Sequence, residues 1–203
     1  YNAYGKVTLC TRLSKADVAD EKMIDVTEMV KNIVPLNKLS DVLKKKKQKQ
    51  ICSEIEKCDM VISRVPSLVA YKVAELAKKM KKPYYAEVIA CAWDAYWNHS
   101  LQGKFLAPYM FFKMKSITKK ADYTLYVTNE FLQKRYPTSG KSVNVSNVKI
   151  SETTEDVIDN RIEKIKNTDK KNITLMTSAA VDVKYKGQEY VIRAIKELEK
   201  AGI

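Results

Sequence analysis

Charged residues follow or interrupt two apolar runs of the sequence, in positions where they can bind a ligand. Arg64 comes directly after the run Asp59–Ser63, and its guanidinium can bind the oxygens of an acceptor or a phosphate, or form a surface salt bridge. Glu87 lies within the run Tyr84–Ala90, where its carboxylate can hydrogen-bond sugar hydroxyls or help to orient an attacking hydroxyl. Both residue types therefore indicate a polar ligand, although an acid in an apolar strand needs a partner in any case.

An aromatic and polar cluster follows the second apolar run. Its members are Trp93, Asp94, Tyr96, Trp97 and Asn98. Aromatic faces beside amide and carboxylate groups suit sugar binding, while a packed loop is an equally open interpretation. The neighbouring His99 is more typical of a loop histidine than of a catalyst.

A second candidate site lies near the end of the chain. Lys184, Lys186 and Gly187 precede a predicted helix, so the free N–H groups and the positive end of the helix dipole favour a phosphate there. Gly187 allows the backbone to approach such a ligand closely.

Alternating strands and helices must position these residues. Ser67 is a natural N-cap, and apolar residues then recur at helical spacing until a helix breaker, Pro83. The strand, helix, strand order predicts a right-handed parallel crossover. The expected later elements are a helix within Lys104–Lys120, a strand Tyr123–Thr128, a short helix Glu130–Tyr136 and a strand Ser142–Ser146.

The rest of the chain is predicted to belong to a second unit. Residues 151–171 are polar and are expected to be a linker, with Val157, Ile158, Ile162 and Ile165 on one face of a helix. A strand Asn172–Ala179 and a helix after Gly187 should follow, the helix with Val191, Ile192, Ala194, Ile195 and Leu198 facing inward. The sequence thus predicts an α/β protein with a parallel sheet, in units 1–150 and 172–203.

The net charge of +13 favours an anionic partner. The three alternatives are a nucleic acid, an anionic membrane surface and a phosphate-bearing substrate. The basic segment Lys44–Gln50 by itself is weak evidence for nucleic acid, and the lack of a recognised binding motif argues against such a partner. The segment Lys104–Lys120 is apolar around much of its circumference, with Leu106, Met110, Met114 and Ile117 in one stripe. It is interpreted either as a surface for an anionic membrane or a lipid-linked acceptor, or as a core helix with a basic edge.

The four cysteines form no C-x-x-C pair and the chain has one histidine, so we expect no metal site. No run of eighteen apolar residues occurs. We expect a cytoplasmic protein, either free or peripheral at the inner face of the plasma membrane.

Several short stretches together resemble one known family. Those in the first unit are Arg64–Ser67 (RVPS), Lys82–Val88 (KPYYAEV), Tyr126–Leu132 (YVTNEFL) and Val145–Val148 (VSNV). A further stretch is Lys184–Glu189 (KYKGQE). In this order they resemble family-4 glycosyltransferases of the GT-B fold, of the type that builds bacterial capsular and other surface polysaccharides.

The resemblance implies a retaining sugar transfer from a nucleotide-sugar to a glycan or a lipid-linked acceptor, without an obligatory cofactor or metal. Residues 1–150 would be the acceptor-side Rossmann-like domain, with its first strand missing, and residues 172–203 the start of the donor domain. Arg64, Glu87, Trp93, Asp94 and Asn98 would bind the acceptor.

The resemblance further implies that Lys186 contacts the nucleotide diphosphate, with Lys184 and Gly187 beside it. Thr128 and Asn147 would line the cleft between the domains. The family's catalytic glutamate pair is expected beyond Ile203, so Glu155/Glu163 and Glu189/Glu197 are interpreted as solvated helix charges, and the 203 residues are expected to be inactive by themselves. Two other functions stay open: a basic nucleic-acid-binding α/β protein, and a sugar- or metabolite-binding module without catalysis.

Overall fold

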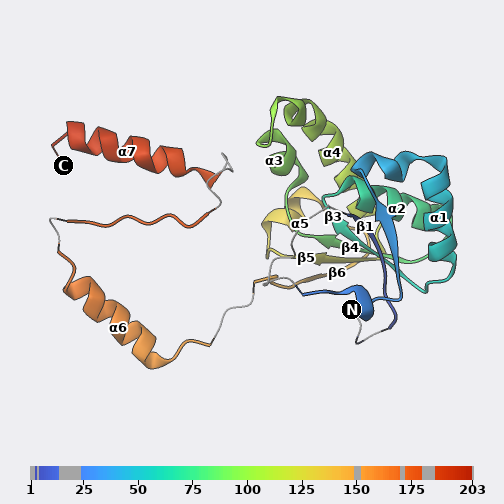
Figure 1. Ribbon diagram of the computed structural model, residues 1–203, viewed down its shortest axis with the longest axis horizontal. Helices are drawn as coiled ribbons and strands as arrows, with labels where there is room; N and C mark the ends of the chain where they lie inside the picture. The colour runs from blue at the N-terminus through green and yellow to red at the C-terminus, as the bar shows by residue number, and fades with distance from the viewer. Residues whose placement is uncertain are drawn as a thin grey trace. The chain divides into compact units, whose positions relative to one another are not determined.

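The structure is a computed structural model that describes residues 3, 5–13, 24–148, 152–169, 172–179 and 186–202. The chain forms two compact units, Tyr1–Asn147 and Val148–Ile203 (Figure 1). Each unit is described by itself below. In the described part of the chain, no helix is both long enough and apolar enough to cross a membrane.

The first unit contains two parallel sheets. A small sheet pairs β1 (Thr8–Arg12) with β2 (Asn32–Leu36), flanked by short 3-10 helices at Thr27–Met29 and Leu39–Leu43. The main sheet has the order β3-β4-β5-β6, formed by Val61–Val65, Tyr84–Val88, Tyr123–Tyr126 and Lys141–Asn144. Every pairing in it is parallel. The predicted α/β class with a parallel sheet is therefore confirmed, while the sequence analysis had not identified β2.

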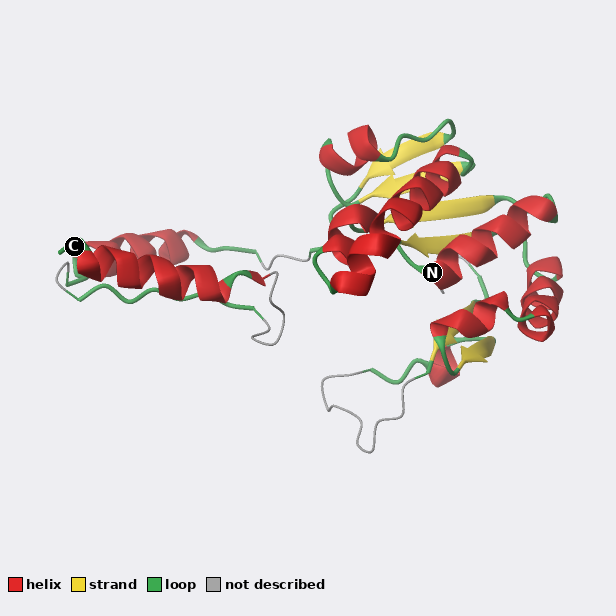
Figure 2. Ribbon diagram, turned by 90° about the horizontal axis from the view of Figure 1, so that it is seen from above, coloured by secondary structure: helices red, strands yellow, loops and turns green. Residues whose placement is uncertain are grey.

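Helices connect the strands of the main sheet (Figure 2). They are α1 (Lys45–Glu56) before β3, α2 (Leu68–Lys79), α3 (Ala92–Trp97) with α4 (Leu101–Lys119), and the short α5 (Phe131–Arg135). The predicted N-cap of α2 is confirmed, since the Ser67 hydroxyl accepts a hydrogen bond from the Ala70 amide. The basic segment that begins at Lys44 forms the first turns of α1.

The core lies between the main sheet and these helices. Because consecutive strands are neighbours and all are parallel, right-handed crossovers place their connections on the same face of the sheet. The residues of β3 alternate accordingly: Val61, Ser63 and Val65 are buried, whereas Ile62 and Arg64 are exposed. Tyr84 of the covered face donates a hydrogen bond to the Ile117 carbonyl of α4. The opposite face of the main sheet carries the exposed residues of β3, which are Ile62 and Arg64.

Helix α4 differs in one respect from the prediction. Met110, Met114 and Ile117 are buried, which agrees with the core-helix interpretation, but Leu106 is 43 % exposed. The N-terminal half of α4 packs on α3 instead, with its closest approach at Gly103. A Cβ at Gly103 would collide with the Tyr96 carbonyl oxygen, so this close helix contact turns the helix and leaves Leu106 outside it.

The second unit contains α6 (Glu155–Lys166) and α7 (Gln188–Lys200). The helices are those predicted, but residues 172–179 form no strand, because a single strand has no partner with which to share its hydrogen bonds in this part of the chain. For the same reason the apolar face of α7 is not covered: Ile192, Ile195 and Leu198 are exposed rather than inward. This corrects the expectation of a strand and an inward-facing helix.

Candidate functional site

Arg64 and Glu87 lie side by side near the carboxyl ends of β3 and β4. The register pairs the two residues directly, and the Arg64 Nε atom is 3.8 Å from the Glu87 Oε2 atom. The Arg64 side chain is 62 % exposed and that of Glu87 is 12 % exposed. The sequence had indicated that Arg64 follows the strand. Strand β3 extends to Val65, however, so Arg64 lies inside the strand, one residue before its end.

Burial has an electrostatic consequence for Glu87. Withdrawal of the carboxyl group from water raises the pKa of Glu87, because the charged form loses more solvation than the neutral form. A carboxyl group of this kind binds a proton more tightly than a carboxyl group in water does. Beside the exposed guanidinium of Arg64, this pair can hold a ligand with hydroxyl and anionic groups.

The aromatic and polar cluster is a short helix, α3, rather than a loop. The Trp93 ring stacks on Trp97 with 5.1 Å between centroids and meets Phe111 edge-on at 6.2 Å. The Asn98 side-chain amide donates to the Asp94 carbonyl at 3.0 Å, which satisfies the last turn of the helix. The Asp94 side chain is exposed. Trp93 thus has a packing role, while Asp94 is accessible to a ligand.

A residue that the sequence analysis did not identify holds the start of this helix. The N-cap residue of α3, Cys91, makes no side-chain capping hydrogen bond. Instead the buried Tyr136 hydroxyl accepts from the Ala92 amide at 2.9 Å and lies 3.3 Å from the Cys91 sulfur. The pKa of Tyr136 is raised to about 12, mainly by burial and to a smaller extent by the hydrogen bond with Cys91. The hydroxyl group therefore stays protonated at neutral pH. The contact spans 44 residues, and no local pattern predicts it.

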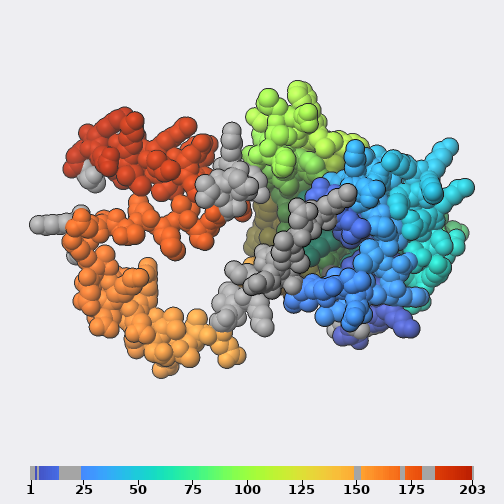
Figure 3. Space-filling view, in the orientation of Figure 1, coloured from blue at the N-terminus to red at the C-terminus, as the bar shows by residue number. Residues whose placement is uncertain are grey.

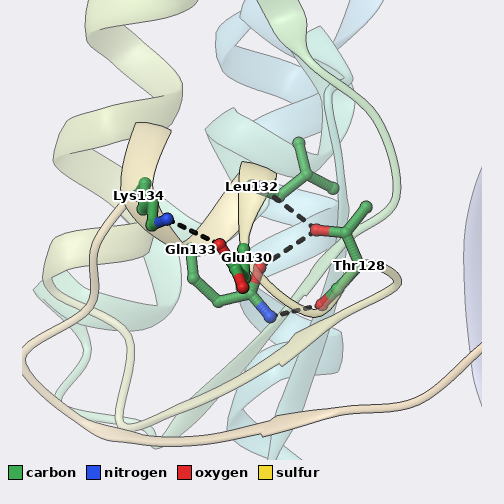
Figure 4. A network of polar contacts seen from close by, with 5 residues as sticks. All are labelled: Thr128, Glu130, Leu132, Gln133 and Lys134. Carbon is green, nitrogen blue, oxygen red and sulfur yellow. Dashed lines mark hydrogen bonds and ion pairs between the residues drawn. The ribbon is translucent and has the colours of Figure 1, made fainter.

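Thr128, predicted for the cleft between domains, hydrogen-bonds to the first turn of α5 (Figure 4). Its Oγ1 atom accepts from the Leu132 amide at 3.1 Å and donates to the Gln133 Oε1 atom at 3.0 Å. The Gln133 side-chain amide also donates to the Thr128 carbonyl. This network satisfies free backbone groups at the start of α5, so the Thr128 hydroxyl is already committed within the first unit.

Asn147, the other residue predicted for the cleft, is exposed at the end of the first unit. At the same end of the sheet, the Asn144 side-chain amide donates to the Asn129 side-chain oxygen at 2.7 Å. The structure therefore brings Arg64 and Glu87 together. It places Trp93 and Asp94 on α3 and Asn98 at the C-cap of that helix.

The predicted phosphate-binding residues belong to the second unit. Gly187 is the N-cap of α7 and adopts φ 82°, a left-handed conformation that favours glycine. Lys186 precedes it and is exposed. Lys184 lies outside the described residues. The turn thus places Gly187 at the start of α7 and the exposed Lys186 directly before it.

Among the described residues, no group of three His, Cys, Asp or Glu side chains lies close enough to hold a metal ion. The cysteines of the described chain are all free thiols.

Comparison with known proteins adds one relative. The chain is similar to protein CapJ of Staphylococcus aureus. The two sequences are 38 % identical over 152 residues, which is 73 % of this chain and 36 % of CapJ. The chain therefore spans little more than a third of that protein. No protein-family model matches the chain, and no solved structure matches it either.

Proposed function

We propose that this chain is part of a glycosyltransferase of surface-polysaccharide synthesis, which moves a sugar from a nucleotide-sugar to a glycan or lipid-linked acceptor at the cytoplasmic side of the membrane. The observation that carries the proposal is the similarity to CapJ, whose name points to capsule synthesis. The resemblance of the strand-end stretches to family-4 glycosyltransferases supports the reaction class, with retention of anomeric configuration and no obligatory metal.

The main sheet supports an acceptor site at its carboxyl end, since ligands of parallel α/β sheets bind there. Arg64 would bind an anionic group of the acceptor, because its guanidinium is exposed. The ion pair between its Nε atom and Glu87 would orient the guanidinium. Glu87 would hydrogen-bond the acceptor's hydroxyls. Asp94 of α3 and Asn98 at its C-cap would add polar contacts near the stacked indole rings of Trp93 and Trp97.

The second unit supports a donor site. The N-terminus of α7, with Gly187 as its cap and Lys186 before it, would bind the diphosphate of the nucleotide-sugar. Lys184, which the resemblance places beside them, would add a second positive charge. Stabilising the leaving diphosphate and positioning the two substrates would supply most of the rate enhancement.

The test uses the protein at its full natural length, incubated with uridine and guanosine diphosphate-sugars and an extract of lipid-linked acceptors. Release of the nucleoside diphosphate together with a labelled acceptor is the expected result. Lys186→Ala should lower kcat/KM for the donor by roughly tenfold or more, because a hydrogen bond to a charged group contributes about 1.5–3 kcal/mol. Lys196→Ala, an exposed lysine further along α7, is the matched control and should leave kcat/KM unchanged.

Arg64→Ala should raise KM for the acceptor and leave the KM for the donor as it was. Tight donor binding without any turnover would instead assign the protein to the non-catalytic sugar-binding class. An equal loss with Lys186→Ala and Lys196→Ala would contradict the proposed donor site.

A further inference from the structure

Helix α4 exposes an apolar row on the side opposite its buried residues. Leu101 is 76 % exposed, Phe105 89 % and Phe112 66 %. At about 3.6 residues per turn, the spacing of Leu101, Phe105, Pro108 and Phe112 puts them on one side of the helix. Met110, Met114 and Ile117 occupy the other side and are buried. The helix is thus apolar on both faces, while only one of them is covered by the described part of the protein.

Basic residues continue this row toward the C-terminal end of α4. Lys115 and Lys119 fall on the same side as Leu101 and Phe112, and both are exposed. We call Leu101, Phe105, Pro108, Phe112, Lys115 and Lys119 the outer row. The segment Leu101–Lys120 contains no Asp or Glu. At the other end, the Lys104 ammonium lies 5.6 Å from the centre of the Trp97 ring, and Trp97 is itself 39 % exposed.

A basic hollow adjoins the end of the outer row. It has a volume of about 640 Å³ and lies at the amino ends of β5 and β6, away from the strand ends where Arg64 and Glu87 lie. Its charged lining consists of Lys78, Lys119, Lys120, Lys141 and Asp122. The Asp122 carboxylate accepts from the Tyr84 amide, and within the described chain none of these lysines forms an ion pair with it. The hollow therefore presents a surplus of positive charge.

Exposed aromatic and aliphatic side chains in line with lysines that form no ion pair within the described residues match one kind of partner. A helix that lies in the plane of a membrane buries its apolar face among the acyl chains while its lysines reach the headgroups. Anionic lipids attract such lysines. A second copy of this chain would bring two basic rows together, and nucleic acid offers nothing to cover leucine and phenylalanine side chains.

We propose that the outer row of α4, with the adjoining basic hollow, docks the protein on an anionic lipid surface. Figure 3 shows the α3 and α4 region, in green to yellow-green, at the surface of the first unit. The docking does not depend on the proposed sugar transfer, because it uses neither Arg64 and Glu87 nor the turn at Gly187.

The experiment measures sedimentation of the 203-residue chain with vesicles of phosphatidylcholine alone and of phosphatidylcholine mixed with phosphatidylglycerol. Binding is expected with the mixed vesicles only, together with a blue shift of tryptophan fluorescence, since both tryptophans of the chain, Trp93 and Trp97, lie on α3. The double variant Phe105→Ser/Phe112→Ser should weaken binding by at least about tenfold, because it removes most of the apolar area that inserts.

A charge-matched pair of variants separates docking by α4 from general attraction. Lys115→Gln/Lys119→Gln should weaken binding roughly thirtyfold, which corresponds to about 2 kcal/mol for two lysines at an anionic surface. Lys45→Gln/Lys46→Gln removes the same charge from exposed positions of α1 and should change binding far less. Far-UV circular dichroism of each variant checks that it has folded.

Three results would overturn the proposal. The first is the absence of binding to mixed vesicles by the unaltered chain, or equal binding to phosphatidylcholine alone. The second is an equal loss of binding with the α1 and α4 lysine variants. The third is a dimer in solution, without vesicles, that Phe105→Ser/Phe112→Ser converts to monomer, because this would assign the outer row to a second copy of the chain.

Discussion

Replacing Tyr136 by phenylalanine removes a single oxygen atom from the core of the first unit. The Tyr136 side chain is fully buried, and its hydroxyl accepts from the Ala92 amide at 2.9 Å. Ala92 is the first residue of α3 and is also fully buried, so no water can replace the lost acceptor. The substitution therefore leaves a helix N-terminus without its cap.

The expected loss follows from that geometry. A buried amide left without an acceptor costs about 1–3 kcal/mol, and loss of a helix cap costs about 1 kcal/mol when it is measured on its own. These two values describe the same hydrogen bond, so they are not added. We expect the free energy of unfolding to fall by about 2 kcal/mol.

Urea denaturation followed by tryptophan fluorescence measures this loss. Trp93 and Trp97 are the only tryptophans in the chain and both belong to α3, so the signal reports on the helix that the hydroxyl caps. With a slope of about 2 kcal/mol per molar urea, the midpoint should fall by about 1 M. Tyr123→Phe is the matched control: it removes the same atom from a residue that is 42 % exposed, and the midpoint should stay within about 0.3 M. If the two variants shift the midpoint equally, the Tyr136 hydroxyl does not cap α3.

Three further substitutions test other parts of the structure. Because burial raises the pKa of Glu87, the folded state binds this proton more tightly than the unfolded state, and stability is lost as pH rises through the folded pKa. Glu87→Gln should therefore be more stable than the unaltered protein at pH 7, with the difference vanishing below the ordinary pKa of 4.5 in denaturation curves taken across that range. Gly140→Ala should cost about 1–3 kcal/mol and lower the melting temperature, since its Cβ would collide with the Ala121 carbonyl oxygen in front of β5; an unchanged melting temperature would show that β6 can shift freely. Met114→Ala, at a fully buried position of α4, should cost about 2–5 kcal/mol in the same urea assay, and a loss below about 1 kcal/mol would contradict the packing of the inner face.

Local signals in the sequence predicted most elements of the first unit. The Ser67 cap, the helical spacing after it and Pro83 define α2 and the start of β4, because capping and helix breaking depend on neighbouring residues only. Strand β2 (NIVPL) was missed because a short apolar run that contains a proline is weak evidence by itself, and because its pairing with β1 crosses about twenty residues. The opposite error occurred at residues 172–179, where strand-forming residues have no partner strand in the described chain.

The features of the candidate site can likewise be separated into those that the sequence predicted and those that tertiary structure decided. The sequence by itself predicted polar residues at the carboxyl ends of parallel strands and a glycine at the start of α7, because alternating strand and helix patterns and a capping position are local properties. Tertiary structure decided which of these residues meet. Register alone places Arg64 beside Glu87, and burial alone raises the pKa of that carboxyl group.

Tertiary structure also decided what each face of α4 does. In the sequence, Met114 and Phe112 are equally apolar members of one helix, and periodicity cannot tell which of two apolar faces turns inward. The close approach of α3 at Gly103 and the sheet under Met114 fix the rotation of the helix, which buries one row and exposes the other. The chain's own residues thus determined that α4 forms, and packing determined that its outer row faces the solvent.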